Sequence, residues 1–103
     1  MDGEVWKPTD IDDRYYISNK GRVKSYTGYK AKLLGLYENN AGYLRVHIND
    51  KKYLVSRLVA TAFVVNDDKK NKIVVDHLDE NRKNNSADNL EWVTISDNIK
   101  RHY

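Results

Sequence analysis

The sequence predicts an α+β fold, in which antiparallel β-hairpins and a short helix precede a unit of two strands and a final helix. Three patterns support this prediction. Apolar and polar residues alternate over residues 43–48, as in a strand with one buried face. Apolar residues recur at helical spacing over residues 57–63. Two short apolar runs, at residues 73–75 and 90–93, then enclose a polar loop. The 103 residues are expected to form one compact domain.

The N-terminal half is predicted to consist of hairpins. Residues 1–13 are expected to be an extended lead-in, with Trp6 packed on the core. A turn at Ser18–Gly21, with Gly21 in a left-handed conformation, joins two strands. The predicted strands are Tyr15–Ile17, Arg22–Tyr26, Leu33–Tyr37, Tyr43–Ile48 and Tyr53–Val55. Alternation in the clearest of them places Tyr43, Arg45 and His47 on one exposed face.

The C-terminal half is predicted to begin with a helix, for which Ser56 is a suitable N-cap. Thr94 or Ser96 is expected to cap the final helix, which carries Asn98 in its first turn. The first helix is predicted to run to about Phe63. Between it and the final helix, the sequence predicts a charged connector at residues 66–72, a buried strand at Ile73–Val75, a polar loop at residues 79–88 and a strand at Leu90–Val93.

Positive charge is concentrated in the middle of the chain. Residues 14–57 hold ten Lys or Arg and two acidic residues, interleaved with Tyr, whereas residues 1–13 hold one Lys and five acidic residues. The overall net charge is only +3. A basic surface of this kind is suited to DNA, because neutralising phosphates releases counterions. Charge alone is equally compatible with a solvated basic sheet.

The composition argues against several classes of protein. The sequence has no Cys, which excludes disulfides and thiolate zinc sites and agrees with a reducing compartment. No apolar run approaches the ~20 residues of a membrane span, and residues 1–13 lack the apolar segment of a signal peptide. We therefore expect no membrane partner and a cytoplasmic location.

Four polar residues are expected to meet within the predicted two-strand unit. Asp76 and His77 follow its first strand, Asn89 precedes its second strand, and Asn98 lies on the helix. Carboxylate and amide oxygens are ligands for hard divalent cations, and an imidazole can accept a proton near neutral pH. A lone His at a strand end is usually a packing residue, so the complete set carries the interpretation as a catalytic site.

The order Asp-His, then Asn-Leu-x-Trp-Val-Thr, then an Asn on the following helix resembles the HNH nuclease motif. The spacings from His77 to Asn89 and from Asn89 to Asn98 are twelve and nine residues. Upstream, Tyr-x-Ile-Ser-Asn-Lys-Gly-Arg-Val-Lys-Ser and Arg-Leu-Val-Ala-x-Ala-Phe are similar to the N-terminal module of phage and intron-encoded homing endonucleases. The resemblance implies a DNA-contacting β module over residues 1–55, and a linking helix with an HNH ββα-metal unit over residues 56–103.

The resemblance also implies a role for each residue of the set. Asp76 and Asn98 would hold a single Mg²⁺ or Mn²⁺ ion, and His77 would be the general base of phosphodiester hydrolysis. Asn89 would fix the loop and orient the imidazole. The alternative is a DNA-binding regulator or phage packaging accessory that keeps the fold without cutting, and the complete set of residues disfavours it.

Double-stranded DNA is the expected partner, bound by a monomer or by a homodimer. Its contacts are expected from basic and aromatic residues of the middle segment and of the polar loop: Arg22, Lys24, Lys30, Lys32, Tyr43, Arg45, His47, Arg57, Arg82 and Lys83. For Tyr43 and His47, ordinary cross-strand packing on a solvated face is the competing explanation.

Overall fold

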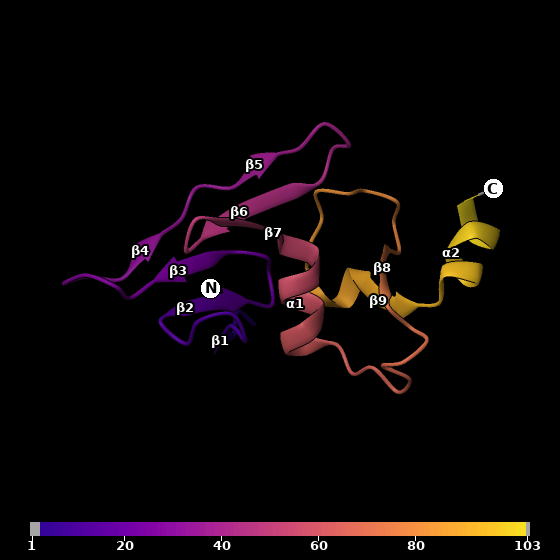
Figure 1. Cartoon of the computed structure of the whole chain (residues 1–103), viewed down its shortest axis with the longest axis horizontal. Helices are drawn as coiled ribbons and strands as arrows, with labels where there is room; N and C mark the ends of the chain where they lie inside the picture. The colour runs from indigo at the N-terminus through magenta and orange to yellow at the C-terminus, as the bar shows by residue number, and fades with distance from the viewer. Residues whose placement is uncertain (1–2, 103) are drawn as a thin grey trace.

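The computed structural model describes residues 3–102, with the backbone alone at His102. These residues form three small antiparallel sheets around a helix (Figure 1). The first sheet contains β1 (Trp6–Pro8), β2 (Tyr15–Ser18), β3 (Val23–Ser25) and β4 (Lys32–Leu33); the second contains β5 (Tyr37–Glu38), β6 (Leu44–Ile48) and β7 (Lys51–Leu54); the third contains β8 (Val74–His77) and β9 (Leu90–Val93). The helices are α1 (Val55–Phe63), the short 3-10 helix η1 (Ala87–Asn89) and α2 (Ile95–His102). The predicted α+β class is confirmed.

Tight turns set the register of the hairpins. Gly21 has φ +88°, a conformation that glycine adopts without strain, and the turn it ends pairs Ile17 with Val23. Between β6 and β7, Asn49 and Asp50 both have positive φ, as the favoured two-residue hairpin turns require. The predicted turn at Ser18–Gly21 is therefore confirmed.

One hydrophobic core joins the two halves of the chain. It takes buried residues from the first sheet, the second sheet, α1 and β9: Ile17, Val23, Val46, Ile48, Val55, Leu58, Val59, Ala60 and Leu90. Figure 1 shows α1 between the N-terminal sheets and the β8–β9 hairpin. The side chains of the C-terminal unit are thus positioned against a scaffold that the N-terminal sheets help to build.

The predicted lead-in is partly wrong. Within it, residues 6–8 form β1, because their backbone pairs with the open edge of β2. Trp6 is absent from the core cluster; it is half-buried, and the Lys24 ammonium lies 4.1 Å from the centre of its ring. A cation over an indole face is an attractive contact outside the core. Met1 and Asp2 lie outside the described residues.

Four other element predictions need correction. The strand predicted at Tyr53–Val55 is instead Lys51–Leu54, because Val55 already belongs to α1. The strand predicted at Leu33–Tyr37 is divided between β4 and β5, which belong to different sheets. Ser56 is not the N-cap of α1: the cap is Leu54, because β7 runs directly into the helix and leaves Ser56 buried in its first turn. The strand predicted at Ile73–Val75 is shifted, so that Ile73 is 45% exposed and the buried residues are those at the end of β8.

Candidate active site

The end of β8 buries two polar side chains. Asp76 is 7% exposed and His77 is 5% exposed. Neighbouring residues of a strand point to opposite faces; here Asp76 contacts α2, whereas His77 contacts the loop between β8 and β9. The antiparallel register pairs Asp76 with Glu91 and His77 with Leu90. One strand end therefore presents a carboxylate and an imidazole to different partners.

Asp76, His77 and Asn98 line the same cavity, which has a volume of about 280 Å³. Asn98 is placed there by the start of α2. The Thr94 hydroxyl accepts a hydrogen bond from the backbone N–H of Asp97, and the Thr94 carbonyl accepts one from that of Asn98, both at 3.0 Å. This confirms Thr94 as the cap of the final helix. The same cavity is also lined by Tyr43, Glu80 and Arg82.

Arg101 is a residue of this site that the sequence analysis did not find. Its Nη1 donates to Asp76 Oδ2 at 2.9 Å, and its Nη2 donates to Glu91 Oε1 at 2.8 Å. A buried carboxylate is costly unless it is paired. Arg101, from the last turn of α2, therefore compensates the charge of Asp76 and ties the helix to the β8–β9 hairpin.

The imidazole of His77 is held by Asn85. Its Nε2 lies 2.8 Å from the Asn85 Oδ1, and both side chains are buried. Asn89, which was expected to orient the imidazole, instead donates from Nδ2 to Asp79 Oδ1 and to the Asn84 carbonyl, both at 2.9 Å. The expectation that Asn89 fixes the loop agrees with these contacts, but the hydrogen bond to the imidazole comes from Asn85.

Asp79 is the centre around which the polar loop folds. Its carboxylate accepts hydrogen bonds from the side chains of Asn84 and Asn89 and from the backbone N–H of Asn81. The Asn84 amide is the main cause that lowers the pKa of Asp79, followed by the Asn81 N–H and the Asn89 amide. This carboxylate is engaged within the loop and acts as an internal support.

The residues predicted to contact DNA fall into several groups. Arg82 lies beside the active-site cavity, where its guanidinium is 4.9 Å from the ring of Tyr43 and its Nη1 donates to the Ala41 carbonyl at 2.6 Å. On the same face of β6, Arg45 and His47 both contact the ring of Tyr37. The predicted exposed row is only partly present: His47 is exposed, whereas Arg45 and Tyr43, the residue before β6, are half-buried. Tyr43 is the member of the row that lines the cavity with Asp76 and His77.

The remaining basic candidates differ in how they are already engaged. Arg22 forms an ion pair with Glu4, and Lys83 forms one with Glu38. Lys30, two residues before β4, and Lys32, the first residue of β4, are both exposed. Those two ammonium groups are therefore more available to a phosphate than the paired ones.

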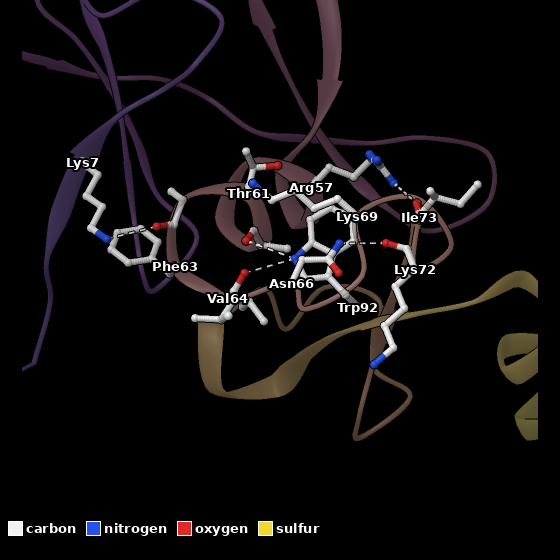
Figure 2. Close-up of a pocket in the computed structure, with 13 residues that line it drawn as sticks. Lys7, Arg57, Thr61, Phe63, Val64, Asn66, Lys69, Lys72, Ile73 and Trp92 are labelled. Atoms are coloured by element: carbon white, nitrogen blue, oxygen red, sulfur yellow. Dashed lines mark hydrogen bonds between the residues drawn. The ribbon is translucent and has the colours of Figure 1, made fainter.

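Arg57 belongs to a different cavity from Asp76, His77 and Asn98. That cavity has a volume of about 600 Å³ at the C-terminal end of α1, and Figure 2 shows Arg57 and Trp92 among the residues that line it. The Arg57 guanidinium lies 5.3 Å from the Trp92 ring, and its Nη1 donates to the Ile73 carbonyl at 2.8 Å. These contacts support the hairpin and separate Arg57 from the other predicted DNA contacts.

A β8–β9 hairpin, a following helix and a cavity lined by Asp, His and Asn form the arrangement expected of an HNH nuclease. The HNH endonuclease model matches residues 53–100, and the NUMOD4 motif matches residues 4–49. The chain therefore belongs to the HNH endonuclease family, with a NUMOD4 motif preceding its HNH domain.

Two relatives and one solved structure illustrate the similarity. The uncharacterized HNH endonuclease L247 of Acanthamoeba polyphaga mimivirus is 38% identical over 104 residues, which cover 94% of this chain and 25% of the relative. The DNA endonuclease I-HmuI of Bacillus phage SP01 is 34% identical over 100 residues, covering 92% and 55%. A structure described as DNA binding and cleavage by the HNH homing endonuclease I-HmuI matches with a TM-score of 0.79 and 34% identity, over 94% of this chain and 56% of that one. The chain spans between a quarter and just over half of the length of these proteins.

None of the helices within the part of the chain that the structure describes is long and apolar enough to cross a membrane.

Proposed function

We propose that this chain is a DNA endonuclease that hydrolyses phosphodiester bonds with one divalent metal ion and a His general base. The observation that carries the proposal is the meeting of Asp76, His77 and Asn98 in one cavity of an HNH domain. These side chains come from two elements that are far apart in the sequence, and each supplies a group that the reaction uses.

The donor atoms of the cavity fit a hard cation. Asp76 supplies a carboxylate and Asn98 an amide oxygen, which are ligands that Mg²⁺ and Mn²⁺ accept. Mg²⁺ sites commonly use only one or two protein carboxylates and complete their coordination with water and substrate phosphate. An ion bound by Asp76 and Asn98 would stabilise the negative charge that develops on the phosphate and on the leaving oxygen.

His77 is the proposed general base. Since its Nε2 is engaged by Asn85, its Nδ1 is the atom that would take the proton from the attacking water. Burial of the ring and the 2.8 Å contact hold it in one orientation, which favours proton transfer in a fixed direction. Asn89 and Asp79 support this geometry through the loop, without touching the reacting atoms.

The DNA is proposed to lie across the face of β6 that carries Arg45 and His47 and to reach the cavity beside Arg82. Tyr43 and Arg82 border both the cavity and this face, so they join the proposed binding surface to the proposed catalytic residues. Lys30 and Lys32 would contact phosphates farther along the first sheet. A monomer with one such site would nick one strand at a time, and a homodimer would be needed to cut both strands together.

The test is incubation of the whole chain with supercoiled plasmid in Mg²⁺ or Mn²⁺, with a chelator as the control. Relaxed or linear plasmid that appears only with the metal is the expected result. His77→Ala serves as a second control, because it removes the proposed base without changing the basic surface. Plasmid that is bound in a gel-shift assay but stays supercoiled would support the non-cleaving regulator instead.

A further inference from the structure

Asn85 is a buried polar residue that the proposed mechanism uses only through His77. It is 4% exposed, although residues 80–83 of the same loop are exposed. Its Oδ1 lies 2.8 Å from His77 Nε2. An amide oxygen only accepts hydrogen bonds, so the imidazole nitrogen facing it carries the hydrogen. The other ring nitrogen, Nδ1, is then left with the lone pair that a base needs.

A turn of the N-terminal module packs directly against Asn85. A Cβ atom added at Gly21 would lie 3.1 Å from the Asn85 Cβ and 3.4 Å from the Asn85 carbonyl oxygen. These distances are tighter than most Cβ contacts, so Asn85 would have to move by a few tenths of an ångström to accept a side chain at position 21. The positive φ of Gly21 also favours glycine. The tip of the β2–β3 hairpin therefore packs directly against Asn85.

The same turn is fastened to both neighbouring segments. The Asn19 carbonyl accepts a hydrogen bond from the backbone N–H of Ala87 at 2.8 Å, which ties the turn to η1 two residues beyond Asn85. The Asn19 side chain accepts from the backbone N–H of Val5 and donates to the Gly3 carbonyl. The Ser18 hydroxyl accepts from two backbone N–H groups within the turn. These bonds hold the turn in one shape.

We infer that Asn85 is a positioning residue for His77, and that the Asn19–Gly21 turn of the NUMOD4 segment holds Asn85 in place. Asn85 selects the tautomer with hydrogen on Nε2 and fixes the ring, while the turn prevents the Asn85 side chain from swinging away. The N-terminal module is thus a structural part of the proposed active site as well as a proposed DNA contact. The consequence for cleavage rests on the proposed function; the consequence for the tautomer does not.

The first measurement is the ¹⁵N NMR spectrum of the His77 ring in the metal-free chain, at a pH where the ring is neutral. Wild-type protein is expected to show hydrogen on Nε2. Asn85→Leu keeps the volume but removes the acceptor, so it should populate the other tautomer. Asn85→Asp keeps an acceptor and should retain the wild-type tautomer. Asp88→Asn, at an exposed residue of η1 three positions beyond Asn85, is the matched control and should leave the tautomer unchanged.

The second measurement tests the turn. Gly21→Ala should perturb the His77 ring signals in the same direction as Asn85→Leu. Asp50→Ala is the control for backbone strain alone, because Asp50 also has positive φ but lies in the turn between β6 and β7. It should leave the His77 signals unchanged. Equal effects of Gly21→Ala and Asp50→Ala would overturn the role of the turn.

Cleavage by the same variants separates this inference from the proposed function. Asn85→Leu should lower the single-turnover rate by ~10–100-fold, by analogy with the loss of a residue that orients a metal-bound His, while DNA affinity stays the same. Asn85→Asp should recover part of that loss. Wild-type protein with hydrogen on Nδ1, or an Asn85→Leu variant with unchanged tautomer and rate, would overturn the inference. If neither wild-type protein nor any variant cut DNA, the proposed function would be refuted, but the conclusion about the His77 tautomer would still hold.

Discussion

At the scale of single residues, the side chains of the candidate site have two different proposed roles. Asp76 and Asn98 are proposed to hold the metal ion, whereas His77 is proposed to move a proton. The three line one cavity, but Asp76 also accepts a hydrogen bond from Arg101, and His77 is bonded to Asn85. These separate partners allow each role to be removed independently.

Substitution should therefore divide metal binding from proton transfer. Asp76→Asn should weaken Mn²⁺ binding and cutting together, because it removes the charged ligand. Asn98→Ala should do the same more mildly, since an amide oxygen is a neutral ligand. His77→Ala should keep Mn²⁺ binding and lose ~10²–10⁴-fold in rate. Calorimetric titration measures Mn²⁺ binding, and plasmid nicking at limiting enzyme measures the rate. If His77→Ala nicked plasmid at the wild-type rate, the assignment of His77 as the base would be refuted.

A second residue-scale prediction concerns the ion pair between Glu4 and Arg22. The hydrogen bond from Arg22 lowers the pKa of the Glu4 carboxyl from 4.5 to about 2. A carboxyl whose pKa is lowered on folding stabilises the fold above its unfolded pKa, and this stabilisation is lost as the pH falls toward the folded value. Glu4→Gln should thus be less stable than wild type at neutral pH, and the difference should shrink between pH 4.5 and about 2. Urea midpoints across this range provide the measurement; a constant difference would contradict it.

At the scale of elements, local signals were sufficient wherever the determining contact is short-range. The turn at Ser18–Gly21 and the cap at Thr94 both depend on residues within four positions, and both were predicted. The start of α1 was misplaced because Ser56 has the chemistry of a cap, whereas the strand β7 continues into the helix and buries it. A cap preference of about 1 kcal/mol is readily outweighed by burial of the first turn.

The contacts that complete the site have no comparable local signal. Asn85 and His77 are separated by a loop without periodicity, and Arg101 reaches Asp76 only because α2 folds back on the hairpin. Trp6 contacts Lys24 because β1 pairs with β2, and no local pattern in the sequence predicts that pairing. The Asp76, His77 and Asn98 set was recognisable because its order matches a known motif, whereas the residues that position it depend on the tertiary fold.

Strand β4 and the connection that precedes it offer a test of DNA binding at the scale of one element. Lys30 and Lys32 are exposed, so replacing both with Ala should leave folding intact. The slope of log K against log salt should fall by about one unit per lost phosphate contact. The double substitution of Lys69 and Lys70, two exposed cations of the α1–β8 connector, removes the same charge elsewhere and is the control. If the slope of log K against log salt changed equally in both double variants, the DNA would not be bound specifically at Lys30 and Lys32.

At the scale of the whole molecule, the shared core makes the two matched segments one unit. Residues of β2, β3 and β6 pack in the same cluster as α1 and Leu90 of β9. The turn at Asn19–Gly21 adds polar contacts between the same two halves. Since neither segment keeps its core contacts without the other, we expect the NUMOD4 and HNH segments to unfold together.

The two Trp residues make this expectation measurable, because Trp6 lies in β1 and Trp92 in β9. In a Trp6→Phe background, Trp92 alone reports on the HNH domain. Adding Ile17→Val, in β2, removes one methylene group from a fully buried side chain and should cost ~0.5–1.5 kcal/mol of unfolding free energy. Trp92 fluorescence and far-UV circular dichroism should then shift to the same lower urea midpoint, although Ile17 lies in the other segment. Val65→Ala, at a side chain that is 90% exposed, is the matched control and should shift neither signal. A Trp92 transition that stays in place while the circular dichroism moves would mean that the HNH domain unfolds independently, and that the hairpin turn cannot hold Asn85 through a common core.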